Sequence, residues 1–201
     1  MNLMNAIYRN LTIGLVAAAL LGGGLYMFVL PHLAAPSANA AQPSLDKPYV
    51  ITITMPDDAK SILVADVTRL KQTLQTDPQD FDSWLDLALH YKIAGDYKDA
   101  EEVWKYIVQT GPQNTHYIAL GNLGNLYEFF LKDYPKAEEF LLQAIALKPD
   151  QISFYRDLYT LYHYGYKVGT GADSSILEQG LKANPGDKDL LNLQQQLKAG
   201  K

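Results

Sequence analysis

Hydrophobic residues recur with helical spacing over most of the chain after residue 56, and prolines punctuate that pattern at regular intervals. Pro78, Pro112, Pro149 and Pro185 each follow an amphipathic stretch, and they lie 34, 37 and 36 residues apart. A self-similarity with a period in the mid-thirties is typical of paired helices stacked in an array. The pattern therefore predicts an all-α domain built from helical hairpins.

The repeats agree at the positions that helical spacing would bury. On the first helix of each pair, an aromatic or leucine is followed at constant spacing by Leu, a further residue and Tyr. The three sets are Trp84, Leu87, Ala88 and Tyr91; Leu120, Leu123, Gly124 and Tyr127; and Tyr155, Leu158, Tyr159 and Tyr162. On the second helices, Ala100, Trp104, Ile107 and Pro112 are matched by Ala137, Leu141, Ala144 and Pro149. These spacings predict two regular repeats and a third that departs from them.

This arrangement resembles the tetratricopeptide-repeat (TPR) family, most closely over residues 81–148. The resemblance implies a TPR-type helical-hairpin superhelix of about three repeats with flanking capping helices. The expected segments are an N-terminal capping helix (57–80), repeat 1 (81–114), repeat 2 (115–150), a divergent repeat 3 (151–186) and a C-terminal capping helix (187–199).

A different pattern precedes the repeats. Residues 11–30 carry no charge and are mostly apolar, and twenty such residues match the hydrocarbon thickness of a bilayer. Arg9 precedes this run and the next basic residue is Lys47, so the positive-inside rule predicts a cytoplasmic segment over residues 1–10. The sequence therefore predicts one transmembrane helix, with the repeat domain in the periplasm or an equivalent extracytoplasmic space.

A cleaved signal peptide is the competing interpretation of the same region. Ala38, Asn39 and Ala40 have the small-residue pattern of a cleavage site. The apolar run is longer than a usual signal core and ends ten residues before Ala40, which favours a retained anchor. Cleavage near Ala40 would release a secreted domain on the same side of the membrane.

The segment between the apolar run and the repeats is predicted to be a tether. Residues 31–56 hold several prolines among Ala, Ser and Asn, a composition typical of an extended linker. Within it, Tyr49–Met55 alternates and is rich in β-branched residues, which predicts a short strand. The chain offers no partner strand. The segment therefore either packs on the repeat domain as an ordered extended linker, which we favour, or pairs with a strand of another protein.

Composition narrows the possible chemistry. The formal net charge of −5, with no basic stripe, disfavours a nucleic-acid partner. The absence of cysteine excludes disulfides, thiol nucleophiles and thiolate metal sites. The histidines are far apart in sequence and form no ligand pair, and no nucleophile elbow is present. The sequence therefore predicts no enzyme activity, no metal site and no cofactor.

The resemblance also implies where a partner would bind. In the TPR family, ligands lie in the concave groove lined by the first helix of each repeat. The matching positions in this sequence are Leu85, Leu89, Asn122, Asn125, Phe129, Arg156, Thr160 and His163. Leu85 and Leu89 occupy the places where the chaperone-binding subgroup has a lysine and an asparagine, so we expect no carboxylate clamp.

Five tyrosines cluster in the third repeat, and tyrosine is favoured at interfaces. Helical periodicity assigns Tyr155, Tyr159 and Tyr162 to the packing face, which leaves Tyr164 and Tyr166 as candidates for partner contact.

These patterns together predict a membrane-anchored protein-protein interaction scaffold or assembly factor that binds a peptide or protein through the groove. Two alternatives remain open. One is an accessory or substrate-positioning subunit of a membrane-bound maturation or secretion complex, and the other is a structural homo-oligomer.

Overall fold

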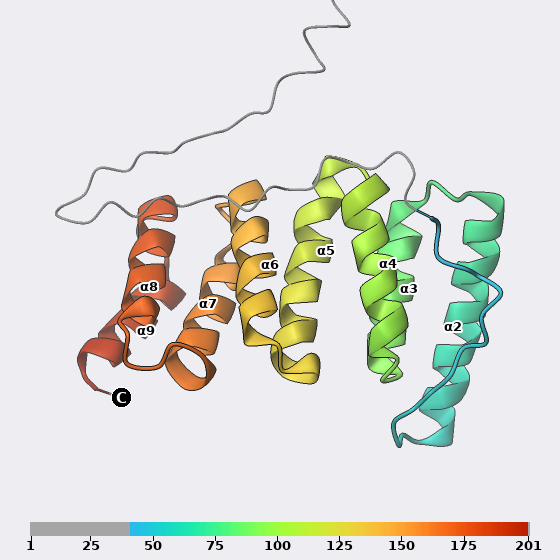
Figure 1. Cartoon of the computed structure of the whole chain (residues 1–201), viewed down its shortest axis with the longest axis horizontal. Coiled ribbons are helices and arrows are strands. Elements are labelled where there is room, and N and C mark those ends of the chain that lie inside the picture. The colour runs from blue at the N-terminus through green and yellow to red at the C-terminus, as the bar shows by residue number, and fades with distance from the viewer. Residues whose placement is uncertain (1–40, 201) are drawn as a thin grey trace, which may run out of the picture. The chain divides into compact units, whose positions relative to one another are not determined.

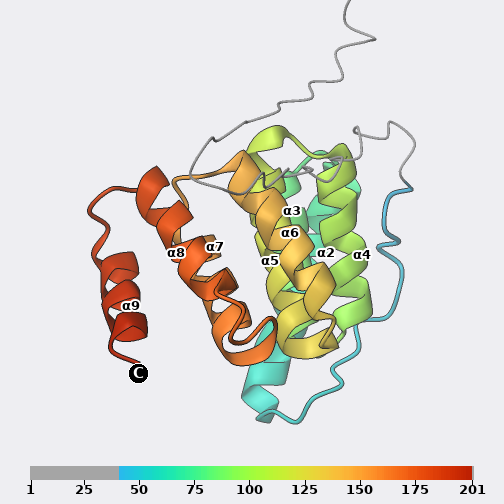
Figure 2. The same ribbon diagram turned by 60° about the vertical axis from the view of Figure 1, so that its left-hand side comes forward.

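The computed structural model describes residues 41–200, which form a row of helices standing side by side in chain order (Figure 1). The elements are α2 (Asp57–Thr76), α3 (Phe81–Ile93), α4 (Tyr97–Thr110), α5 (Gln113–Leu126), η1 (Tyr127–Leu131), α6 (Tyr134–Leu147), α7 (Ile152–Thr160), η2 (Leu161–Gly165), α8 (Ala172–Ala183) and α9 (Lys188–Lys198). In the turned view of Figure 2, the two helices of a hairpin run alongside each other. The prediction of an all-α fold is confirmed for this part of the chain.

Part of the sequence-based prediction lies outside the described residues. The expected membrane-spanning segment (11–30), the cleavage motif ending at Ala40 and the first part of the tether (31–40) all belong there. Between residues 41 and 200, no helix combines the length and the apolar character needed to cross a bilayer.

Aspartate side chains define where four of the helices begin. In each case the carboxylate accepts a hydrogen bond from the backbone N–H three residues further along, which satisfies a donor that has no partner within the helix. Such a cap stabilises a helix by about 1 kcal/mol. The capping residues of α3, α4, α6 and α9 are Asp80, Asp96, Asp133 and Asp187.

The first helices of repeats 2 and 3 end differently from that of repeat 1. Helix α3 stops near Ile93, and Gly95 then turns the chain with a φ of 82°. Helices α5 and α7 instead continue into the π-helical turns η1 and η2. The turn of repeat 2 is one residue longer in sequence, and a π-turn accommodates a single inserted residue within a helix. Lys132, with a φ of 56°, then takes the left-handed position that Gly95 fills in repeat 1.

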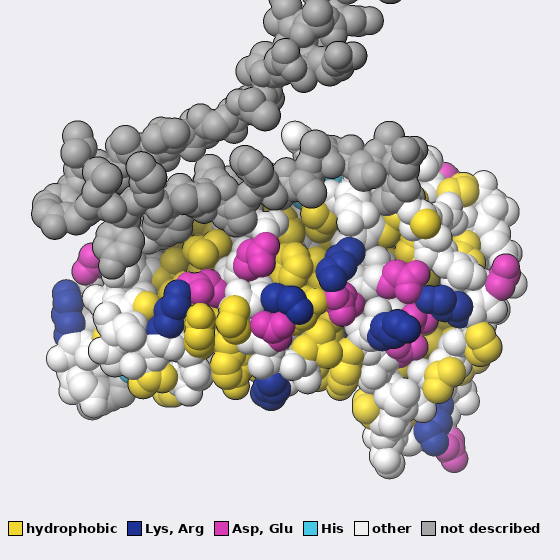
Figure 3. All heavy atoms as spheres, viewed as in Figure 1, with side chains coloured by type: hydrophobic (Ala, Val, Ile, Leu, Met, Phe, Trp, Pro, Cys, Tyr) yellow, Lys and Arg dark blue, Asp and Glu magenta, His cyan; other side chains and the backbone are white. Residues whose placement is uncertain are grey.

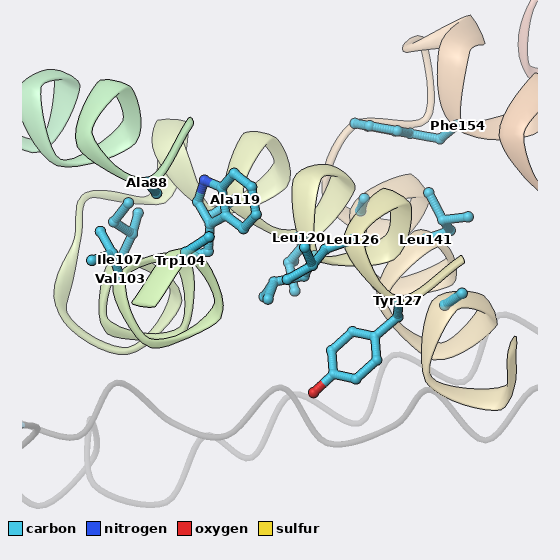
Figure 4. Close-up of a cluster of buried hydrophobic side chains, with 14 of the residues drawn as sticks. Ala88, Val103, Trp104, Ile107, Ala119, Leu120, Leu126, Tyr127, Leu141 and Phe154 are labelled. Carbon is cyan, nitrogen blue, oxygen red and sulfur yellow. The ribbon is translucent and has the colours of Figure 1, made fainter. Parts of the chain in front are cut away.

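The hydrophobic core runs without interruption from α2 to α9. Trp84 and Trp104 are fully buried, and Figure 4 shows a cluster of buried side chains that includes Trp104 and Ala119 of the next repeat. The crossing of α5 and α6 requires a residue without a side chain, because an added Cβ on Gly124 would lie 2.6 Å from Cγ of Leu141. The small residue in the repeat pattern is therefore explained by close helix packing.

Residues 43–53, which we call the strap, lie against the helices without forming a strand, and their backbone turns at Leu45 and Asp46. The Thr52 N–H donates to the carbonyl of Ala94 over 2.8 Å, at the end of α3. The Tyr49 hydroxyl donates to the carbonyl of His90, and its ring lies 5.8 Å from that of Tyr91. The strand prediction for Tyr49–Met55 is thus wrong. The backbone of this segment bonds to a single free carbonyl at a helix end, whereas a strand would need the repeated hydrogen bonds of a sheet edge.

The other half of the strap is held by charge. The Lys47 ammonium lies 3.1 Å from a carboxylate oxygen of Asp99 and 2.8 Å from one of Glu102, both on α4. These hydrogen bonds raise the pKa of Lys47, with that to Glu102 contributing most. From α2, Lys71 donates to the carbonyl of Lys47. Over residues 43–53, the segment is therefore held against the repeat domain by hydrogen bonds and ion pairs.

Candidate protein-binding face

The first helices of repeats 1 and 2 lie closer to each other than their second helices do. Helix α3 contacts α5 directly, whereas the second helices α4 and α6 share at most a marginal contact. Between α5 and α7 the approach is also close, because a Cβ added to Gly121 would overlap the ring of Phe154. We call the surface of α3, α5 with η1, and α7 with η2 the first-helix face. Between repeats 1 and 2, the closer spacing of the first helices makes this the inner side of the curvature.

Exposed apolar side chains stand at matching places along the first-helix face. Ile93, Phe129 and Tyr164 occupy the last turn of the first helix in successive repeats and are 41%, 49% and 72% exposed. Leu89, one turn before Ile93, is also exposed. We call these four residues the apolar row. Large apolar side chains that repeat in this way on one surface are typical of sites that bind other proteins.

The structure places four of the other sequence-predicted residues in less accessible positions. Leu85 is half-buried and packs against the core. Asn122 and Thr160 are also half-buried. Tyr166 is half-buried as well, with its ring 6.3 Å from that of Tyr134, so it contributes to packing as well as to surface.

Three further predicted residues already have partners inside the domain. Arg156 is exposed and lies 3.5 Å from a carboxylate oxygen of Asp189. His163 lies 2.8 Å from a carboxylate oxygen of Asp173 and stacks on the ring of Tyr159. Asn125, the third, acts on the carboxylate of Asp157 on α7 in the direction that lowers its pKa. The packing tyrosines Tyr155, Tyr159 and Tyr162 are buried, as their periodicity predicts.

Two carboxylates that sequence reasoning missed lie beside Asn125. Glu128, in η1, is 6% exposed, and burial together with the charge of Asp157 raises its pKa to about 7, against the opposing charge of Lys132. Burial also raises the pKa of Asp157, while Asn125 and Arg156 act in the opposite direction. We call Glu128 and Asp157 the acid pair. A sequence signal existed, since Glu128 directly follows a core tyrosine of the repeat.

The second helices present a different surface chemistry. The Tyr127 hydroxyl donates to the carboxylate of Glu101 in the preceding repeat, and Lys105 donates to the same group. Burial opposes the charge of Glu101, but these two hydrogen bonds and the charges of Lys105 and Lys136 together lower the pKa of the carboxyl. Tyr162 and Glu138 repeat the contact one unit later. Figure 3 shows charged side chains of both signs interleaved with hydrophobic ones on the face turned to the viewer. These tyrosine-carboxylate contacts therefore join each repeat to the one before it.

Within residues 41–200, no group of three or more acidic, histidine or cysteine side chains is arranged to hold a metal ion. The His163 and Asp173 pair is the arrangement closest to catalytic machinery in this part of the chain. The His163 ring stacks on Tyr159 and makes an edge contact with Tyr164.

Comparison with known proteins supports the fold. No family model matches the sequence, and no curated protein matches it either. Among solved structures, the crystal structure of MamA matches with a TM-score of 0.51 and 23% sequence identity, over 74% of this chain and 86% of that chain. At this level of identity the likeness shows the fold alone. The domain therefore has a TPR-like helical-repeat fold, as its sequence pattern predicts.

Proposed function

We propose that this protein is a membrane-anchored scaffold that binds a peptide or protein segment on its first-helix face. The observation that carries the proposal is the apolar row, in which Ile93, Phe129 and Tyr164 are exposed at equivalent repeat positions. Keeping such side chains in water is unfavourable by about 25 cal/mol for each Å² of apolar surface, and a bound segment would remove that surface from solvent. A TPR-like fold supplies a rigid frame for this kind of contact.

The anchor in this proposal rests on the sequence. The uncharged segment 11–30 would hold the chain in the bilayer with residues 1–10 in the cytoplasm, and the repeat domain would face the extracytoplasmic side. Intact-mass measurement of the protein from cells tests the retained anchor. The full-length mass is expected. The mass of a mature chain that begins near Ala41 would instead indicate a cleaved and secreted protein.

Capture of a partner from intact cells tests the binding face. Crosslinking followed by purification in mild detergent compares the wild type with a Phe129→Ala, Tyr164→Ala double variant. A matched control is the double variant Ile62→Ala, Val64→Ala, which removes two exposed apolar side chains from α2. The wild type and the control are expected to retain the same protein, and the first double variant is expected to lose it.

Both double variants should keep the far-ultraviolet circular dichroism of the wild type, because all four side chains are substantially exposed. Equal capture by all three proteins would remove the first-helix face from the proposal. Self-association as the only crosslinked product would favour a structural homo-oligomer instead.

A further inference from the structure

Exposed apolar side chains gather where the first helix of each repeat turns into the second. These turns lie along the lower edge of the row in Figure 1, and we call this edge the turn end. Phe130 and Leu131 end η1 and are 42% and 38% exposed, and Val168, after η2, is 62% exposed. At the first turn Ile53 packs over Gly95, where an added Cβ would lie 2.7 Å from Cγ2 of Ile53. Hydrophobic side chains reach this edge in Figure 3.

Contacts between aromatic rings join the three turns into one surface. The ring of Phe130 lies 4.7 Å from that of Tyr97, the first residue of α4, so the turn of repeat 2 meets that of repeat 1. The rings of Tyr134 and Tyr166 lie 6.3 Å apart and connect the turns of repeats 2 and 3. The three tyrosines are half-buried, so each keeps part of its side chain at the surface.

The opposite end of the array has a different chemistry. Its connections, over residues 77–80, 111–112, 148–151 and 184–187, hold no exposed large apolar side chain. They consist mainly of proline, glycine, asparagine, glutamine and charged residues. Their acids Asp77, Asp80, Asp150 and Asp187 exceed their one lysine, Lys148. The two ends of the helices are therefore unlike, with the acidic charge gathered away from the apolar turns.

The turn end has lysines that no acid neutralises. Lys98 and Lys132 are exposed and take part in none of the salt bridges within residues 41–200. The exposed acids on the same side are Asp57 and Asp58, at the start of α2 and next to repeat 1. A surface that avoids these two acids is centred on repeats 2 and 3, around Leu131 and Val168.

We infer that the turn end, centred on repeats 2 and 3, rests on the surface of the bilayer that anchors the chain, with Leu131 and Val168 entering the head-group region. This inference rests on the proposed anchor and adds a second surface to the proposed function. Twelve residues, 31–42, separate the uncharged run from the strap. A chain of that length spans at most about 40 Å when fully extended, so an anchored domain stays close to the bilayer.

The composition of the turn end fits a lipid surface. Tyrosine is enriched at membrane interfaces, where its ring lies at the level of the head groups. Lysine lays its aliphatic stem along apolar material and keeps its ammonium group in water, where it attracts anionic lipids. With the turns in contact with lipid, α3, α5 and α7 stand with one end on the bilayer. The first-helix face then stays open to solvent along the length of these helices, where a partner is proposed to bind.

The test uses the full-length protein, whose lack of cysteine lets one introduced cysteine carry a fluorophore at a chosen site. Leu131→Cys and Val168→Cys label the turn end. Ile118→Cys and Leu191→Cys are matched controls, because both side chains are 37% exposed and lie nearer the opposite end, in α5 and α9. Each protein is labelled with the polarity-sensitive dye NBD and reconstituted in vesicles of phosphatidylcholine and phosphatidylglycerol. Half of the vesicles contain a lipid with a nitroxide quencher near its head group.

The turn-end labels should lose most of their emission in the vesicles that contain the quencher, and the control labels should keep theirs. The emission maximum of the turn-end labels should also lie at shorter wavelength than that of the controls. Adding Leu131→Ser to the protein labelled at Val168→Cys should reduce the quenching, because it removes an apolar side chain from the same contact. Adding Ile118→Ser should leave the quenching unchanged.

Equal loss of emission at all four positions, or loss at none, would overturn the lipid contact. A change at the turn-end labels that occurs only when a captured protein is added would overturn it too, because the turn end would then bind protein. If the mass measurement shows a mature chain beginning near Ala41, the labels are read on that chain mixed with vesicles. Quenching confined to the turn end would then support the contact without the anchor, and no quenching would overturn it.

The proposed binding face is judged separately. Neither Leu131 nor Val168 belongs to the apolar row, so Leu131→Ser and Val168→Ser should leave partner capture unchanged. Capture that is lost with Phe129→Ala, Tyr164→Ala keeps the first-helix face as a binding surface, whatever the lipid experiment shows.

Discussion

Replacing Glu128 by glutamine isolates the effect of a buried carboxylate on the stability of the repeat array. The substitution keeps the shape of the side chain and removes its ability to ionise. The folded protein binds the Glu128 proton more tightly than the unfolded chain, because burial raises the pKa of the carboxyl in the folded state from an ordinary 4.5 to about 7. The stability contributed by the protonated group is therefore complete below pH 4.5, falls as the pH rises towards 7 and remains lost above it.

The size of the stability change follows from the difference between the two pKa values of Glu128. Each unit of pKa difference corresponds to about 1.4 kcal/mol, so ionisation of Glu128 destabilises the folded state by at most about 3 kcal/mol at pH 8. Relaxation of the site and penetration of water reduce this value, and about 2 kcal/mol is a fair expectation. Glutamine carries no such penalty. The variant should match the wild type at low pH and exceed its free energy of unfolding at high pH.

Urea unfolding, followed by the fluorescence of the fully buried Trp84 and Trp104, measures this difference. The wild type and Glu128→Gln are compared at about pH 5 and about pH 8 in the same detergent. Other titrating groups contribute equally to both proteins, so subtraction of the two free energies leaves the contribution of the one carboxyl. A difference between the proteins that is the same at both pH values would refute the reasoning, because it would mean that Glu128 is not held in a protonated form by its surroundings.

Two further substitutions test the packing. Gly121→Ala should lower the stability by about 1–3 kcal/mol in thermal unfolding, because the new methyl group overlaps the ring of Phe154. Gly165→Ala should be tolerated, because its methyl group would make only an ordinary contact of 3.8 Å with Cζ of Tyr134. Tyr127→Phe removes a hydroxyl that donates to a carboxylate of the preceding repeat, and a loss of about 1–2 kcal/mol in urea unfolding is expected. Tyr117→Phe serves as its control, and an equal loss there would contradict the inter-repeat contact.

Much of the fold was predictable because its determinants are local and periodic. The positions of Trp84, Leu120 and Tyr155 repeat along the chain, and each is buried where the repeat pattern expects it. The alternation in Tyr49–Met55 is also a true local signal, since it marks an extended segment with one side against the protein. Local alternation cannot reveal whether the backbone partner is a strand or, as here, the carbonyl at a helix end.

The acid pair escaped sequence reasoning because its burial depends on packing between repeats. Glu128 and Asp157 are 29 residues apart, and their encounter requires η1 to extend beyond α5 and α7 to pack closely over Gly121. A single carboxylate on a helix is usually solvated, and the place of Glu128 after a core tyrosine does not by itself indicate that the carboxylate is buried. The apolar row was found only in part, because Ile93 becomes apparent only when its repeat position is aligned with that of Phe129.

The strap changes where the folded unit begins. The repeat pattern would set the N-terminal boundary at Asp57, the first residue of α2. A fragment cut there would uncover the ring of Tyr91 and leave Asp99 and Glu102 without the ammonium of Lys47. The smallest fragment that retains every contact of the first repeat therefore starts upstream of residue 43, within sequence that composition alone would assign to a linker. Limited proteolysis should accordingly spare the residues around Thr52, and excision of the domain for biophysical work should include them.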